Sequence, residues 1–132
     1  MLSNMRYLSA EEILVLHSLV IEQYGGSHGV REIELLKSVA HKPQSTFGGS
    51  DLYPALWDKA ATLCEALVNY HVFVDGNKRT ALIAAARFLA INGHEFTATN
   101  SQAEKVIYDV AEKKIDSTKL AVWLKKHSRK LK

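Results

Sequence analysis

The sequence HVFVDGNKR runs from His71 to Arg79 near the middle of the chain. It separates the two most apolar segments of the chain. Before it, apolar side chains recur at three- and four-residue spacing, at Leu56, Ala60, Leu63 and Leu67. After it, residues 81–90 are apolar at nearly every position. A one-sided stripe indicates an amphipathic helix, and an all-round apolar segment indicates a buried one. The sequence therefore predicts two central helices joined by this polar turn.

The flanking sequence predicts four more helices and no convincing strand pair. The signals are a capping box at residues 9–12, an apolar set between Gly29 and Pro43, a second capping box at 101–104 and a start at Asp116-Ser117. Pro54 suits the first turn of the helix that carries the apolar stripe. We therefore expect a compact all-α bundle of about six helices, forming one domain over residues 1–132 with a basic tail at about 125–132.

Composition excludes several classes of protein. The chain has 132 residues, of which 47% are apolar, and only two prolines and seven glycines, so a single globular domain is expected. Its one cysteine, Cys64, cannot form an internal disulfide and falls on the apolar stripe, which indicates a buried, inert thiol in a reducing compartment. With neither a signal peptide nor a membrane-spanning segment apparent, we expect a cytoplasmic protein.

The turn at the start of the second central helix has the composition of an anion site. A helix N-terminus presents unpaired N–H groups and the positive end of the helix dipole. Gly76 allows close backbone approach, Asn77 can donate to a phosphate oxygen, and Lys78 and Arg79 supply full charges at the same end. Phosphate is the natural ligand of such a site.

Asp75 and His71 add chemistry to this anion site. A carboxylate beside a phosphate group repels it unless a cation lies between them, and Mg²⁺ binds to one or two carboxylates together with substrate phosphates. Asp75 is therefore a candidate Mg²⁺ ligand in the presence of a nucleotide. His71 is a candidate general base, because imidazole changes its charge near neutral pH.

A purely structural interpretation of the same residues is also available. Asp75 would be a helix N-cap, Lys78 and Arg79 solvated first-turn residues, and His71 a core histidine. However, cations in the first turn of a helix are disfavoured by the dipole, by a few tenths up to about 1 kcal/mol each. Two of them without an anion are unfavourable, so the phosphate site is the better interpretation.

The turn resembles the signature of the Fic/Doc superfamily, which in the Fic branch runs His-x-Phe-x-(Asp or Glu)-Gly-Asn-Gly-Arg-x-x-Arg. Six positions of this chain match it: His71, Phe73, Asp75, Gly76, Asn77 and Arg79. Lys78 stands at the second Gly and Leu82 at the last Arg, and both departures are typical of the Doc (death-on-curing) branch. Shorter stretches also look Doc-like, so the resemblance covers roughly residues 7–95.

The resemblance implies the toxin of a bacterial toxin–antitoxin module. Such toxins transfer part of ATP to a hydroxyl of a target protein, which in the Doc branch is phosphate transfer to translation elongation factor Tu and in the Fic branch mostly AMP transfer. His71 would then be the base, Asp75 the Mg²⁺ ligand, and residues 76–79 the phosphate cradle. Lys78 and Leu82 favour phosphate transfer, and AMP transfer is the alternative.

The resemblance also implies a target-binding flap and an inhibitor. The turn-rich loop Pro43–Asp51 falls where the superfamily carries the flap, at Thr46, Phe47, Gly48 and Gly49. An ordinary interhelical connection explains the loop equally well. The nearest match to an inhibitory helix, Ser18–Glu22, fails at Gln23. We therefore expect inhibition by a separate antitoxin, with a disordered segment that folds as a helix on this protein.

A nucleic-acid-binding helical domain is the non-enzymatic alternative, suggested by a net charge of +3. Its basic residues would be Lys125, Lys126, Arg129, Lys130 and Lys132. Setting aside these five together with Lys78 and Arg79 leaves ten basic residues against fourteen acidic ones, so the body of the domain is net acidic. We therefore expect neither a nucleic-acid nor a membrane partner.

Overall fold

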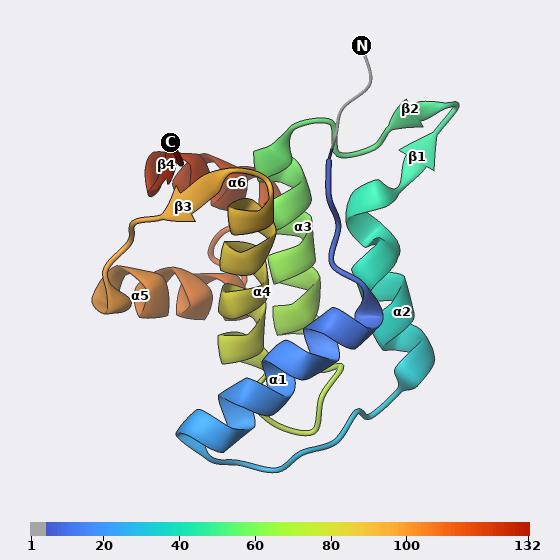
Figure 1. The fold of residues 1–132 in the computed structure, drawn as a ribbon, viewed down its shortest axis with the longest axis vertical. Coiled ribbons are helices and arrows are strands. Elements are labelled where there is room, and N and C mark those ends of the chain that lie inside the picture. The colour runs from blue at the N-terminus through green and yellow to red at the C-terminus, as the bar shows by residue number, and fades with distance from the viewer. Residues whose placement is uncertain (1–4) are drawn as a thin grey trace.

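Two antiparallel helices form the centre of the computed structural model, which describes residues 5–132. They are α3 (Leu56–Asn69) and α4 (Asn77–Ile91), and they lie side by side (Figure 1). Nine of the fourteen α3 residues are buried, as are six of the fifteen in α4. The short connection between them contains the His71–Gly76 turn. The two central helices joined by a polar turn are therefore as the sequence predicts.

Four further helices surround this pair. They are α1 (Ala10–Tyr24), α2 (Ile33–His41), α5 (Asn100–Ala111) and α6 (Ser117–Lys126), and a 3₁₀ turn, η1 (Lys42–Gln44), follows α2. Helix α1 packs on α4 near the His71–Gly76 turn, and α5 lies along the other side of α4 (Figure 1). The expected all-α bundle of six helices is confirmed.

Helix starts follow the capping chemistry, with two shifts from expectation. The Ser9–Glu12 capping box opens α1 as predicted. Helix α5 is opened by Thr99 and Gln102 in place of the box expected two residues later, because Thr99 ends the extended segment and accepts from Gln102 N–H. Pro54 precedes the first helical residue of α3, Leu56, and so lies outside its first turn.

Two short antiparallel strand pairs were not expected. Strand β1 (Thr46–Phe47) pairs with β2 (Ser50–Asp51), and β3 (His94–Phe96) pairs with β4 (Ser128–Lys130). Strands this short show no alternation in the sequence. Gly48 and Gly49 both have positive φ, the geometry of a tight hairpin turn. The region expected to be a loop therefore contains a hairpin.

The basic tail is partly structured. Its residues 128–130 form β4, and the Arg129 guanidinium pairs with the Glu95 carboxylate on β3 at 3.1 Å. The local sequence gives no sign of this pairing, because β3 lies more than thirty residues earlier in the chain. The backbone of these residues is therefore ordered, while the side chains of Arg129 and Lys130 remain exposed to solvent.

The burial of Cys64 and the length of the helices bear on two expectations from the sequence. Cys64 is buried, and burial raises the pKa of its thiol to about 12, so the thiol is protonated and inert at neutral pH. None of the helices in the described chain has the length and apolar character that a bilayer span requires.

Candidate functional site

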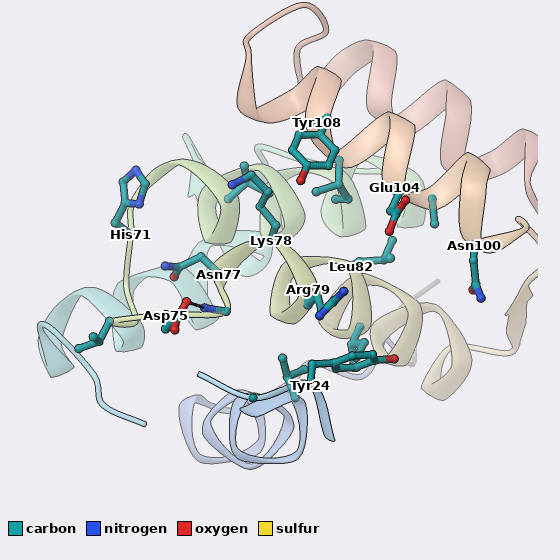
Figure 2. A pocket seen from close by; sticks show the side chains of 18 residues that line it. Tyr24, His71, Asp75, Asn77, Lys78, Arg79, Leu82, Asn100, Glu104 and Tyr108 are labelled. Atoms are coloured by element: carbon teal, nitrogen blue, oxygen red, sulfur yellow. Dashed lines mark hydrogen bonds between the residues drawn. The ribbon is translucent and has the colours of Figure 1, made fainter. Parts of the chain in front are cut away.

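A cavity of about 760 Å³ opens where the α3–α4 turn, the first turns of α4, the end of α1 and one face of α5 meet. Figure 2 shows His71 at one end and Asn100 at the other, with Lys78 and Arg79 between them. The predicted residues His71 and Asp75–Arg79 all line this cavity. The structure thus brings the predicted base, metal ligand and phosphate cradle into one pocket.

Gly76 begins helix α4 in a conformation that suits glycine. Its φ is +76°, in the left-handed region, and a Cβ there would lie 3.1 Å from Ile21 Cδ1 of α1. No side chain caps α4, and its first turn contains no acidic residue. Asp75 is therefore not the N-cap, and residues 76–79 at this helix end all line the pocket, where an anion site stays a prediction.

Asn77 closes the turn through both ends of its side-chain amide. Its Oδ1 accepts a hydrogen bond from Phe73 N–H at 3.0 Å, and its Nδ2 donates to Phe73 O at 2.9 Å. After these bonds the amide has one N–H left to donate. Asn77 therefore shapes the turn first, and its predicted contact with phosphate depends on that one hydrogen and on its backbone N–H.

Asp75 is fixed by backbone groups from two directions. Its Oδ1 accepts from Gly76 N–H at 3.0 Å, and its Oδ2 accepts from Ser27 N–H, just after α1, at 3.2 Å. A Cβ on Gly26 would lie 2.6 Å from Asp75 Oδ2, so only glycine leaves room for the carboxylate. Each oxygen keeps lone-pair capacity, and the carboxylate is exposed.

His17 supports the same turn from beneath. The ring is buried, stacks on Phe73 at 3.8 Å between centroids and donates from Nε2–H to Asp75 O at 2.8 Å. Burial lowers the pKa of His17, against the raising effect of that hydrogen bond, while nearby His28 lowers it further. The neutral Nε2–H tautomer therefore holds the turn. His17 is a core residue on the buried face of α1, which it shares with Ile13, Val20 and Ile21.

His71 is exposed at the mouth of the pocket and has a positive φ of 50°. A non-glycine residue in that region is uncommon and is found preferentially at functional sites. The backbone that follows His71 is held by bonds from Arg31 N–H to Val72 O at 2.8 Å and from Val74 N–H to Gly29 O at 3.0 Å. The imidazole is thus held at the mouth by a rigid backbone and makes no hydrogen bond with residues 5–132.

The two cations at the start of α4 are supported by aromatic rings. Lys78 Nζ lies 5.7 Å from the centre of the Tyr108 ring, and Arg79 Cζ lies 4.0 Å from the centre of the Tyr24 ring. Within residues 5–132, neither cation has a carboxylate partner within 4.0 Å. Their charge is therefore available to an anion in the pocket.

The described residues include no group of three or more histidine, cysteine or acidic side chains that would hold a metal on their own. Mg²⁺ does not need such a cage, because it keeps several waters and binds through one or two carboxylates plus substrate phosphates. Asp75, with open lone pairs beside the uncapped α4 N-terminus, fits that donor set. A metal at this site would be bound together with a nucleotide.

The chain matches the Fic/DOC family model over residues 7–89. It is also similar to "Toxin Doc" of Mycolicibacterium smegmatis, at 42% identity over 89% of this chain and 90% of that protein. A second relative is "Protein kinase doc" of Escherichia phage P1, at 35% identity over 67% of this chain and 70% of that protein. The chain belongs to the Fic/DOC family. Both relatives place it on the Doc branch.

Among the polar and aromatic side chains that line the pocket of this Fic/DOC protein, the sequence analysis does not predict four: Tyr24, Asn100, Glu104 and Tyr108. The last three recur every four residues along α5, so they lie on one face. That spacing shows that they share a face but not what the face is packed against. Their place in the pocket follows from tertiary packing alone.

The predicted flap residues lie elsewhere. Thr46, Phe47, Gly48 and Gly49 form the β1–β2 hairpin, which precedes the opposite end of α3 from the His71 turn (Figure 1). None of them lines the pocket. Phe47 is 82% exposed, so the hairpin presents an apolar side chain to solvent. The role of this Fic/DOC hairpin in target binding stays a prediction.

Proposed function

We propose that this protein is the toxin of a bacterial toxin–antitoxin module and transfers the terminal phosphate of ATP to a hydroxyl of a target protein. The names of the two Doc relatives, a toxin and a protein kinase, support this assignment. The proposed target is translation elongation factor Tu, whose modification would inhibit translation in the bacterial cytoplasm.

One observation carries the choice of phosphate transfer over AMP transfer. Lys78 places a charged side chain in the pocket at the position where the Fic signature has glycine, and Leu82 lines the same pocket where that signature has arginine. A lysine side chain there changes how closely a diphosphate can approach the backbone, and leucine provides no charge for a second phosphate contact. Both changes favour a nucleotide bound with its terminal phosphate toward His71.

The proposed reaction gives each of the predicted pocket residues a role. His71 accepts the proton of the target hydroxyl, whose oxygen attacks the terminal phosphorus. A new oxygen–phosphorus bond forms, the bond between the terminal phosphorus and the β–γ bridging oxygen breaks, and ADP leaves with that oxygen. Lys78, Arg79 and the α4 N–H groups stabilise charge on the phosphate oxygens. When bound, Mg²⁺ on Asp75 would neutralise part of the phosphate charge.

Incubating the purified protein with ATP, Mg²⁺ and bacterial elongation factor Tu, followed by intact-mass measurement of the factor, tests the proposal. A phosphate increment that disappears without ATP supports it. An AMP increment would establish the alternative reaction, and an unmodified factor would refute this target. Labelled ATP in a bacterial lysate then shows whether another protein is modified instead.

The proposed partner that restrains this activity is a cognate antitoxin with a disordered segment that folds as a helix on the toxin. The nearest match to an inhibitory helix within this chain, Ser18–Glu22, fails at Gln23, which supports inhibition by a separate protein. Pull-down from the native host should recover a small co-purifying protein, and recovery of the toxin alone would contradict this part of the proposal.

A further inference from the structure

The Arg79 guanidinium rests on the face of the Tyr24 ring, 4.0 Å from its centre. Figure 2 shows the two side chains meeting inside the pocket, Arg79 coming from α4 and Tyr24 from the end of α1. Within residues 5–132, Arg79 makes neither an ion pair nor a side-chain hydrogen bond. In the described chain, the ring is thus what holds this guanidinium in place.

An aromatic ring and a carboxylate position an arginine with different consequences. A carboxylate would occupy two of the guanidinium N–H groups and offset its charge. A ring face attracts the cation through its quadrupole and restricts the guanidinium plane, but it takes up none of the in-plane donors. Arg79 therefore keeps its full charge and all five N–H groups for a phosphate.

Tyr24 contacts Arg79 and does not belong to the hydrophobic core. Its side chain is 51% exposed, and it is the last residue of α1. Gly25 N–H donates to Ile21 O at 2.8 Å and so ends α1, and shortly afterwards Ser27 N–H donates to Asp75 Oδ2. The last residue of α1 thus contacts Arg79, and the segment after α1 contacts the proposed metal ligand.

We propose that Tyr24 is a positioning residue that orients Arg79 for nucleotide phosphate, an inference that rests on the proposed function. The ring acts through Arg79 and not by touching the nucleotide. Tyr24 therefore affects nucleotide affinity, and its effect requires the arginine. Its hydroxyl is dispensable because the attraction comes from the ring face.

Calorimetric titration with ATP and Mg²⁺ tests this role in Tyr24→Leu and Tyr24→Phe variants. Leucine keeps apolar bulk but removes the ring, so the Kd should rise about two- to fivefold, the effect of a cation–π contact at an exposed site. Phenylalanine keeps the ring and should bind like the wild type. A wild-type Kd for Tyr24→Leu, or equal weakening in both variants, would overturn the proposal. Thermal unfolding should show that both variants fold.

A double-mutant cycle with Arg79→Met separates positioning from direct contact. In the Arg79→Met background, Tyr24→Leu should cause no further loss of affinity. A further loss equal to that of the single variant would mean that Tyr24 touches the nucleotide, and the proposal would be wrong.

The same cycle separates failure of the inference from failure of the proposed function. If Arg79→Met weakens binding and Tyr24→Leu does not, only the positioning role fails. If Arg79→Met binds ATP as tightly as the wild type, the phosphate cradle itself is misassigned and both proposals fail. In steady-state kinetics, a positioning role predicts that KM for ATP rises more than kcat falls in Tyr24→Leu.

Discussion

Two lysines, at the two ends of the α3–α4 pair, are treated in opposite ways by the fold. Lys59 in the first turn of α3 is 1% exposed, and its Nζ donates to Pro43 O at 3.1 Å and to Asp51 Oδ2 at 3.3 Å. Lys78 in the first turn of α4 is exposed and lies against the Tyr108 ring. One charge is committed to protein oxygens, whereas the other is not.

The comparison distinguishes a lysine charge that is paired with protein oxygens from one that is not. Burying an ammonium group is unfavourable unless oxygen atoms replace its water, and Lys59 has two such oxygens at the base of the β1–β2 hairpin. Lys78 keeps its charge available at a helix end where a cation is unfavourable without an anion. The charge at the hairpin end is therefore paired within the protein, whereas the charge at the pocket end has no carboxylate partner among residues 5–132.

The largest expected effect is at the pocket, for His71→Asn. Asparagine tolerates positive φ, so the turn keeps its shape while the base is lost. Phosphate transfer, measured as the rate of target labelling, should fall by about 100-fold or more. The thermal midpoint and the Kd for ATP should stay at wild-type values. Undiminished labelling by this variant would remove His71 from the mechanism.

The next largest effect is expected at the hairpin end. Lys59→Ala should lower the free energy of unfolding by about 2 to 4 kcal/mol, because it empties a buried site that a long side chain fills. Lys59→Met keeps that volume, and Asp51, 50% exposed, stays hydrated, so the loss should be smaller, about 1 to 2 kcal/mol, from the buried Pro43 O that loses its donor. Denaturant unfolding measures both, and neither variant should alter the Kd for ATP. A changed Kd would show that the two ends are coupled.

Lys78→Met should show the converse pattern. Losing a charge-assisted phosphate contact should raise the Kd for ATP about tenfold or more. Stability should stay unchanged or rise by a few tenths up to about 1 kcal/mol, because a cation at the α4 N-terminus is removed. Denaturant unfolding and ATP titration on the same sample check both. A clear loss of stability would place Lys78 with Lys59 as a structural charge.

The smallest effect tests whether a buried group beside the pocket behaves as a structural one. Burial lowers the pKa of His17, so the folded state resists protonation while the unfolded state gains a proton below about pH 6.5. Stability should therefore be complete above that pH and decrease as the pH falls through it, levelling off below the folded-state pKa. The slope from one such group is at most about 1.4 kcal/mol per pH unit.

The control for this measurement is His17→Gln, which keeps a donor but does not titrate. Unfolding curves of both proteins between pH 5 and pH 8 isolate the contribution of His17 from that of the other histidines. Identical pH dependence in the two proteins would show that His17 titrates normally and does not belong with the buried structural groups.

The sequence predicts those features of the fold and of the site that depend on residues close together in the chain. The stripe through Leu56 and Leu67 and the apolar segment 81–90 predicted the central pair, since helix period and burial are visible in one segment. The motif likewise predicted that His71 and Asp75 would share a site, because a helix start can be recognised from its neighbours.

What the sequence left out depends on packing between distant segments. Strand β4 becomes visible only beside β3, and Tyr24 acquires a role only where α1 crosses α4. Asn77 was assigned to phosphate because its type suits that ligand, yet most of its amide is used to close the turn on Phe73. Pairings across long separations carry no local signal that a single sequence reveals.

The walls of the pocket are synthesised at different times, because they come from distant parts of the chain. Tyr24 belongs to α1, the turn with His71 and Asp75 follows about fifty residues later, and Glu104 and Tyr108 on α5 come last. A ribosome making this protein therefore finishes the pocket only after α5 has emerged and docked. Until then the growing chain holds the His71–Gly76 turn without the wall of the pocket that α5 contributes.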